Sequence, residues 1–203
     1  MEESHLRKLF EVYYEDDLEA PRTVPPLESY NAVVAIDYGH GMFDDALISK
    51  LARDAQFLAV NVQTNSGNYG FNLAKRWPRA DYLCVDEPEA RLATQNRDGP
   101  IERSVLDLLA HGFARVIVTQ GKQGAIGCSR DSGIVKDDAM TDRVVDTMGA
   151  GDAFFAVTAL FADQLPVADL LKLGNAAGAL KAQIVGHRSA ITKQQLISYL
   201  KGK

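Results

Sequence analysis

The sequence contains little cysteine, no long apolar run and no cluster of basic residues, and each absence excludes a class of protein. Cys84 and Cys128 stand far apart, without the paired spacing of a zinc site, so reduced cytoplasmic thiols are the simplest interpretation. No segment approaches the length of a transmembrane helix, and the charged first residues do not resemble a signal peptide. The sequence therefore predicts a cytoplasmic protein without a membrane partner.

Acidic residues outnumber basic ones by 27 to 22, which gives a net charge of −5 and a pI near 5.4. Without a basic patch, this balance argues against nucleic acid as a partner. A length of 203 residues and a hydrophobic content of 46% suffice for one domain with a buried core. Composition thus indicates an ordinary globular domain.

From Tyr30 onward, short apolar runs alternate with segments of helical periodicity. Strands are predicted at 32–36, 57–60, 82–85 and 115–119, the first of them buried, and helices at 44–55, 87–93 and 101–112. This alternation predicts an α/β fold with a mostly parallel sheet between helices. The Gly-rich sequence after Thr119 predicts antiparallel edge strands, and helices are predicted at 150–164, 167–185 and 192–200. Residues 1–29 break the pattern and are expected to form an arm or remnant ahead of a domain at 30–203.

The stretch "DTMGAGDAFF" places small residues directly before an acid at the start of a predicted helix. Gly149, Ala150 and Gly151 would let unpaired N–H groups approach an anion, and Asp152 would accept a proton from a hydroxyl beside it. The alternative is an ordinary helix start, because glycine and aspartate are common there.

The longer string resembles the signature D-T-x-G-A-G-D-x-F of the ribokinase-like (PfkB) carbohydrate kinases. The resemblance implies a three-layer ribokinase-like fold and ATP-dependent phosphoryl transfer to a sugar hydroxyl, with ATP and Mg²⁺ as cofactors. It implies that Asp152 is the catalytic base and that Gly149, Ala150 and Gly151 complete the anion hole. Asp146 and Thr147, from the same motif, are then expected near the nucleotide.

Two further stretches resemble the nucleotide site of that family. "VIVTQGKQGA" matches the pattern of a strand followed by T-x-G-x-x-G, which implies that Thr119, Gly121 and Gly124 line the ATP site. "LGNAAGAL" resembles the small-residue helix beside the adenine and implies a role for Asn175. Taken alone, the first would be a pair of β-turns and the second an Ala-rich packing helix.

"DEPEARLA" resembles the N-x-x-E motif that organises the water shell of Mg²⁺. Glu89 matches the glutamate, whereas Asp86 stands at the asparagine position. The alternative, an acid that only stabilises the start of a helix, fits Asp86 equally well, and Glu89 is the stronger candidate of the two.

"AIDYGHGMF" and "NVQTNSGNYGFN" resemble the kinase half of bifunctional heptose-7-phosphate kinase/ADP-heptose synthases. This implies a sugar-phosphate substrate near Asp37 and Asn61, although His40 stands where the related pattern has lysine. A buried structural role for Asp37, and turn capping by the Asn-rich loop around Asn61, fit equally well.

Nothing in residues 1–30 resembles the Gly-Gly motif or the sugar-binding lid of these kinases, so the expected fold is truncated at its amino terminus, without a lid. Strands left unpaired would be exposed, and either homo-oligomerisation or a complementary chain would cover them. The alternative to a kinase is a catalytically incomplete nucleotide-binding module that needs a partner chain or acts in regulation or assembly. A Rossmann dehydrogenase is disfavoured because no G-x-G-x-x-G follows the first strand.

Overall fold

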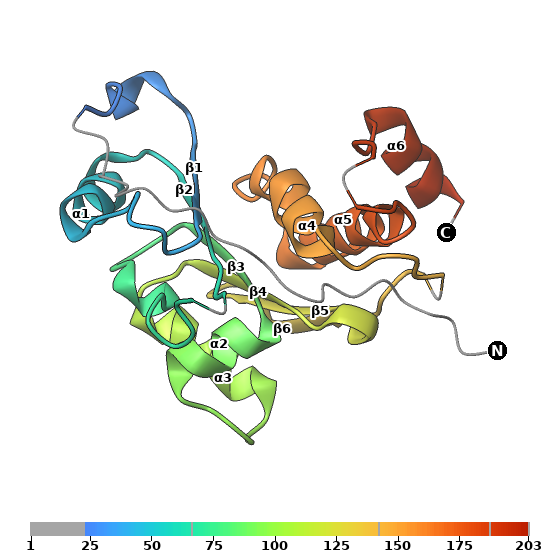
Figure 1. Cartoon of the computed structure of the whole chain (residues 1–203), viewed down its shortest axis with the longest axis horizontal. Coiled ribbons are helices and arrows are strands. Elements are labelled where there is room, and N and C mark those ends of the chain that lie inside the picture. Colours follow the sequence, from blue (N-terminus) through green and yellow to red (C-terminus); the bar gives the residue numbers. More distant parts are fainter. Residues whose placement is uncertain (1–22, 66, 142, 187, 203) are drawn as a thin grey trace.

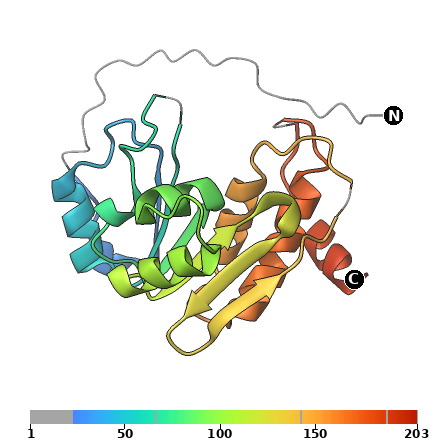
Figure 2. The same cartoon turned by 90° about the horizontal axis from the view of Figure 1, so that it is seen from below.

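The computed structural model describes residues 23–202 except 66, 142 and 187. In that part of the chain a six-stranded sheet lies between two layers of helices (Figures 1 and 2). The strands follow one another across the sheet in chain order, from β1 at one edge to β6 at the other. The predicted α/β architecture with three layers is confirmed.

The first four strands are parallel and the last two antiparallel, as the sequence predicts. Their bounds are β1 Val33–Asp37, β2 Leu58–Val62, β3 Tyr82–Asp86, β4 Arg115–Thr119, β5 Ala125–Ser129 and β6 Gly133–Asp137. Because parallel strands point the same way, the loops after β1 to β4 all leave the sheet at one edge. Ligands of such sheets bind beyond these carboxyl ends.

Helices α1 (Asp45–Asp54), α2 (Glu87–Thr94) and α3 (Ile101–His111) cover one face of the sheet. Helices α4 (Ala150–Ala159) and α5 (Val167–Lys181) cover the other, and α6 (Lys193–Lys201) packs on α5. Single turns of 3₁₀ helix occur at η1 (Leu27–Ser29), η2 (Ala74–Arg76) and η3 (Gly121–Gln123). Leu83 and Val116 anchor the core on the first face, and Tyr82, Ile117 and Phe155 anchor the core on the second.

The capping predictions at two helices are confirmed. The Asp44 side chain accepts a hydrogen bond from the Leu47 N–H, and Thr192 and Gln195 form a reciprocal capping box at α6. Helices α4 and α5 are each shorter at their carboxyl ends than predicted, by a few residues. The chain leaves α5 after Lys181 because the backbone turns toward the segment before α4, where the Gly186 N–H bonds Asp146.

The first strand is not buried as predicted. Val34 and Ile36 are 44% and 40% exposed, although they lie beside Ala59 and Asn61 of β2. Helices α4 and α5 stand over the middle and far edge of the sheet, so within the described residues no helix covers this part of β1 (Figure 1). An apolar run in the sequence indicates a strand, but it does not show whether helices cover both faces of that strand.

Of the predicted amino-terminal arm, residues 1–22 lie outside the described residues. Residues just after them pack on the domain: Leu27 is 4% exposed in the core beside α1, and the Glu28 carbonyl accepts a hydrogen bond from Gln56. In the described part of the chain, no helix is long and apolar enough to cross a membrane.

Candidate functional site

A cavity of about 1140 Å³ opens at the carboxyl edge of the sheet, between α2, which directly follows β3, the loop after β4, and the helices α4 and α5. It is larger than a typical drug-sized pocket and has room for a nucleotide. The predicted site residues that line it are Asp86, Thr119, Gly121, Gly124, Thr147, Ala150, Gly151 and Asn175. The structure thus brings four separate motifs of the sequence to one place.

The GAGD turn forms the amino terminus of α4 and reaches this cavity. Gly149 is the N-cap, with φ 75° and ψ 8°, a left-handed conformation that favours glycine. The Ala150 N–H bonds the Thr147 carbonyl. Among the described residues, none accepts a hydrogen bond from the N–H of Gly151 or Asp152. Two donors at the positive end of a helix therefore remain available to an anion.

Asp152 lies exposed in the first turn of α4 and contacts a side chain from a distant part of the sequence. Gln63, just beyond β2, donates a hydrogen bond from Nε2 to Asp152 Oδ1. The same Nε2 also contacts Asn61 Oδ1 at 3.0 Å, and Asn61 Nδ2 bonds the Cys84 carbonyl at 2.8 Å. A chain of amides thus connects the sheet interior to the predicted base.

Tyr38, in the loop after β1, stands near the same carboxylate. Its side chain is 42% exposed, and burial, together with the negative charge of Asp152, raises the pKa of the Tyr38 hydroxyl. Asp152 is therefore flanked by residues that follow the first two strands.

Asp146, at the start of the motif, lies below the turn and outside the cavity lining. It is 6% exposed, and its two carboxylate oxygens accept hydrogen bonds from the N–H groups of Met148 and Gly186, at 2.9 and 2.7 Å. A carboxylate so engaged fixes the turn, and its predicted contact with a nucleotide stays a prediction.

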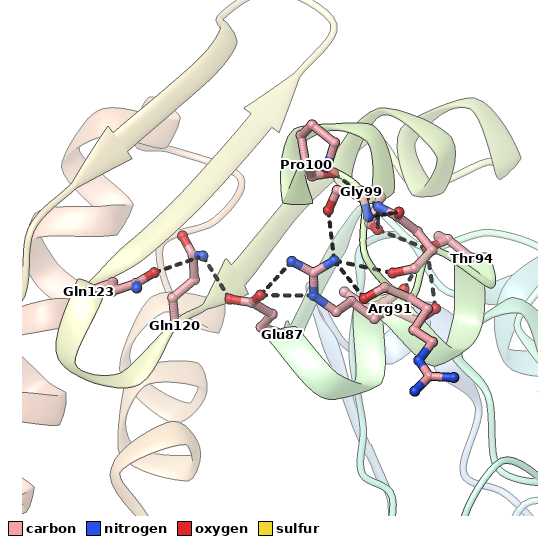
Figure 3. Close-up of polar contacts among 11 residues, drawn as sticks. Glu87, Arg91, Thr94, Gly99, Pro100, Gln120 and Gln123 are labelled. Atoms are coloured by element: carbon pink, nitrogen blue, oxygen red, sulfur yellow. Dashed lines mark hydrogen bonds and ion pairs between the residues drawn. The ribbon is translucent and has the colours of Figure 1, made fainter.

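The loop after β4 forms the opposite wall of the cavity. Gly124 has φ 85°, and a side chain there would collide with the backbone at Asp137 and Asp138, so only glycine fits. Gln120 in this loop bonds Glu87, which also pairs with Arg91 (Figure 3). The Arg91 guanidinium is held in turn by the carbonyls of residues 96, 97 and 99. The network ties the loop to α2 and keeps this wall in place.

Asn175 lies on α5, 7% exposed, at the edge of the cavity. Its Nδ2 donates to the Asp137 carbonyl and carboxylate, at 3.1 and 2.7 Å, and to the Asp138 carbonyl at 3.2 Å. The amide therefore joins α5 to the end of β6, which is the packing role that the sequence left open beside nucleotide contact.

Asp86 and Glu89 form a complete capping box at α2. Asp86 Oδ1 accepts from the Glu89 N–H, and Glu89 Oε2 accepts from the Asp86 N–H, both at 2.8 Å. Glu89 Oε1 also accepts from the Thr64 N–H at 3.0 Å. Burial and the neighbouring Asp86 charge raise the pKa of Glu89 to about 8, and burial raises the pKa of Asp86. The structure shows the helix-capping role of both acids, and their predicted role in holding a cation stays a prediction.

Among the described residues, no group of three or more His, Cys, Asp or Glu side chains could hold a metal ion. Mg²⁺ does not need such a cage, because it commonly keeps several waters and binds through one or two carboxylates plus phosphate oxygens. The Asp86–Glu89 pair fits that mode.

Asp37 and Asn61, the predicted substrate residues, are buried and do not line the cavity. Asp37 is 2% exposed, and its carboxylate accepts from the Gly39 N–H, from Asn72 Nδ2 and from Trp77 Nε1. Asn65 and Asn68 cap their own turn and also donate to the Tyr38 carbonyl. For Asp37, Asn65 and Asn68 the geometry matches the structural alternative, whereas Asn61 lies within β2 and bonds the Cys84 carbonyl instead of capping a turn.

Two residues that line the cavity, Gln120 and Glu87, are not among the residues that the sequence predicts for the site. Gln63 belongs to the Asn-rich stretch expected to offer hydrogen bonds to a ligand, but its contact with Asp152 is not predicted. A glutamine carries no motif signal, and the partner of Gln63 is 89 positions away. Gln120 and Glu87 had one available signal, since Gln120 directly follows the predicted strand 115–119 and Glu87 lies two positions after the predicted strand 82–85, and site residues gather beyond such strand ends.

With the geometry established, comparison with known proteins identifies its relatives. The pattern of the pfkB family carbohydrate kinases matches residues 44–194. Fructokinase-2 of Oryza sativa subsp. japonica is 32% identical over 135 residues, covering 60% of this chain and 39% of that protein.

Solved structures share the fold at lower identity. A ribokinase from Thermotoga maritima superposes with a TM-score of 0.72 at 19% identity, over 86% of this chain and 58% of that one. A putative ribokinase II from E. coli, in complex with ATP and Mg²⁺, has a TM-score of 0.69 at 18% identity, over 87% of this chain and 60% of that one. The chain thus spans less than two thirds of the length of these relatives. Since the family pattern covers most of its length, the chain belongs to the pfkB family of carbohydrate kinases.

Proposed function

We propose that the protein transfers a phosphoryl group from ATP to a sugar hydroxyl, with Asp152 as the general base and the GAGD turn as the anion hole. One observation carries the proposal: the N–H groups of Gly151 and Asp152 lack acceptors among the described residues, and Gly151 lines the cavity. Unpaired donors at a helix start stabilise negative charge, and phosphoryl transfer depends on positioning and charge stabilisation.

The residues present fit ATP and Mg²⁺. Bound MgATP supplies the transferable γ-phosphoryl group and a divalent charge that offsets its negative charge. The loop with Thr119, Gly121 and Gly124 would hold the nucleotide against α5, and Asp86 and Glu89 would receive the cation, through water. A cation there would offset the burial and the neighbouring Asp86 charge that together raise the Glu89 pKa. The putative ribokinase II that shares this fold was solved with ATP and Mg²⁺, which supports the assignment.

Asp152 is placed to take the proton of an incoming hydroxyl. Its Oδ1 is held by Gln63 and its side chain is exposed, so a carboxylate oxygen can face a substrate. The acceptor that the resemblance implies is a heptose 7-phosphate or a related sugar phosphate. Tyr38 and Gln63, next to the base, would then contact the sugar, while Asp37 and Asn61 support them from behind.

A second candidate is a nucleotide-binding module that is catalytically incomplete without a partner chain. The observation in its favour is the edge strand β1, which pairs with β2 alone among the described strands and exposes Val34 and Ile36. Unpaired strand edges with apolar side chains favour pairing with another segment. A second copy of this chain or a complementary polypeptide would complete both the sheet and the sugar side of the cleft.

The first experiment is calorimetric titration of the chain with a non-hydrolysable ATP analogue, with and without Mg²⁺. We expect saturable binding that Mg²⁺ strengthens. Absence of binding in both conditions would refute the nucleotide site and, with it, both candidates.

The second experiment measures sugar-dependent ADP release with fructose, ribose and a heptose 7-phosphate as acceptors. Asp152→Asn should remove turnover and keep analogue binding, because the amide cannot accept the proton. Asp163→Asn, an exposed acid after α4, is the matched control and should behave as wild type. Binding without turnover for every acceptor, together with self-association in sedimentation, would favour the incomplete module. Turnover retained in Asp152→Asn would exclude Asp152 as the base.

A further inference from the structure

Lys181, the last residue of α5, is a buried lysine that the proposed chemistry does not use. Its exposed fraction is 8%, although lysine side chains almost always reach solvent. Among the described residues, no carboxylate forms an ion pair with it. Its ammonium group instead donates to two backbone carbonyls, those of Met148 and Gly186, both at 2.8 Å. A buried charge is costly unless it is hydrogen-bonded, so these two carbonyls fix where the Lys181 ammonium group lies.

The same two residues are held from their other side by Asp146. The Met148 N–H and the Gly186 N–H both bond the Asp146 carboxylate. Met148 and Gly186 are thus each held by two hydrogen bonds: the N–H donates to the Asp146 carboxylate, and the carbonyl accepts from the Lys181 ammonium group. The backbone adds to the connection, because the Val145 and Asp146 N–H groups both bond the Ala182 carbonyl.

These hydrogen bonds lie next to the anion hole. Met148 directly precedes Gly149, the N-cap of α4, and a Cβ placed on Gly149 would lie 3.2 Å from Lys181 Cε and 3.6 Å from Nζ. The ammonium group therefore lies next to the turn whose residues Ala150 and Gly151 line the cavity. A positive charge at this depth adds to the field of the helix start, with little screening by water.

We propose that Lys181 is a positioning residue for the anion hole: its ammonium ion occupies a carbonyl-lined site between residues 148 and 186 and fixes the GAGD turn for the terminal phosphate. The inference rests on the proposed function, because it assigns the phosphate to that turn. The cation site, in which two backbone carbonyls surround the ammonium group, does not depend on the proposed function.

The test compares ligands that do and do not reach the turn. In Lys181→Met the aliphatic stem stays and the charge is lost. We expect the affinity for the ATP analogue to fall roughly tenfold or more, because two buried carbonyls lose their donor, while adenosine affinity changes less than twofold. Lys172→Met, an exposed lysine of the same helix, should leave both unchanged. Equal losses for analogue and adenosine, or no loss for either, would overturn the positioning role.

Chemical rescue tests the cation site without any nucleotide. Lys181→Ala should melt several degrees below wild type, and ammonium chloride should restore part of the difference. Tetramethylammonium chloride at equal concentration should not, because that ion is too large for the site and has no N–H donors. Wild type and Lys172→Ala should respond alike to both salts. An identical response of Lys181→Ala to the two salts would refute the site. If wild type fails to bind the analogue but the rescue holds, the proposed function is wrong and the cation site stands.

Discussion

The raised pKa of Glu89 leads to a quantitative expectation about proton release. At a pKa of about 8, the Glu89 carboxyl is roughly nine-tenths protonated at pH 7. A divalent cation bound beside Asp86 and Glu89 favours the ionised form of both acids. Binding of the Mg²⁺ complex of the ATP analogue at pH 7 should therefore release close to one proton from the protein. At pH 9 the same step should release about one-tenth of a proton.

The assay is calorimetric titration in buffers of different ionisation enthalpy, which yields the number of protons exchanged. Protons from the nucleotide itself are removed by comparison with Glu89→Gln, which keeps the side-chain shape and cannot titrate. Glu102→Gln is the control: Glu102 also begins a helix, but its hydrogen bond to Lys136 lowers its pKa, so it is already ionised. Equal proton release by wild type and Glu89→Gln at pH 7 would contradict the assignment of Glu89 to the cation.

The same pKa has a consequence for stability without ligand. The folded-state pKa is raised above its ordinary value near 4.5, so the protonated form of Glu89 is favoured by folding. The contribution to the free energy of unfolding is complete below about pH 4.5 and is lost as the pH rises through about 8. The melting temperature of Glu89→Gln should consequently depend less on pH across this window than that of wild type. A parallel pH dependence of the two would refute the shift.

Two further predictions concern the turn and its partner. Gly149→Ala places a Cβ on a residue with φ 75° and crowds Lys181. It should lower the free energy of unfolding by about 1 to 2 kcal/mol in denaturant titrations and weaken binding of the ATP analogue. Gly151→Ala is the control and should retain stability, because the space around Gly151 is open. Gln63→Ala removes the hydrogen bond to the Asp152 carboxylate. It should lower kcat about tenfold with little change in KM for ATP, because Gln63 contacts the proposed base but does not line the cavity. A change in KM alone would contradict that role.

Much of the fold was predictable because the strands and helices are marked locally. Unbroken apolar runs mark β2, β3 and β4, and the caps Asp44 and Thr192 mark where two helices begin. The site was predictable where a motif requires a backbone conformation, as at Gly149 and Gly124. In each case one short segment carries its own physical signal.

The remainder depends on contacts between distant segments. The Gln63–Asp152 hydrogen bond joins residues 89 positions apart, and nothing in the sequence around either residue predicts the other as its partner. From the sequence alone, Lys181 would be interpreted as a solvent-exposed lysine at the end of a helix. Its spacing from Gly174 and Gly178, at seven and three positions, places it on their face of α5, which is the only sequence sign that it points inward.

Burial separates the four aspartates that the sequence marked as functional. Asp37 and Asp146, 2% and 6% exposed, spend their oxygens on backbone and side-chain donors, so their charge is compensated within the protein. Asp86 and Asp152 are more exposed than the other two, and the proposed function assigns a cation to Asp86 and a proton to Asp152. A motif names acids without ranking them. The rank follows from where each acid lies relative to the donors around it: the two buried acids hold the turn and the loop after β1 in shape, and the proposed function assigns the chemistry to the other two.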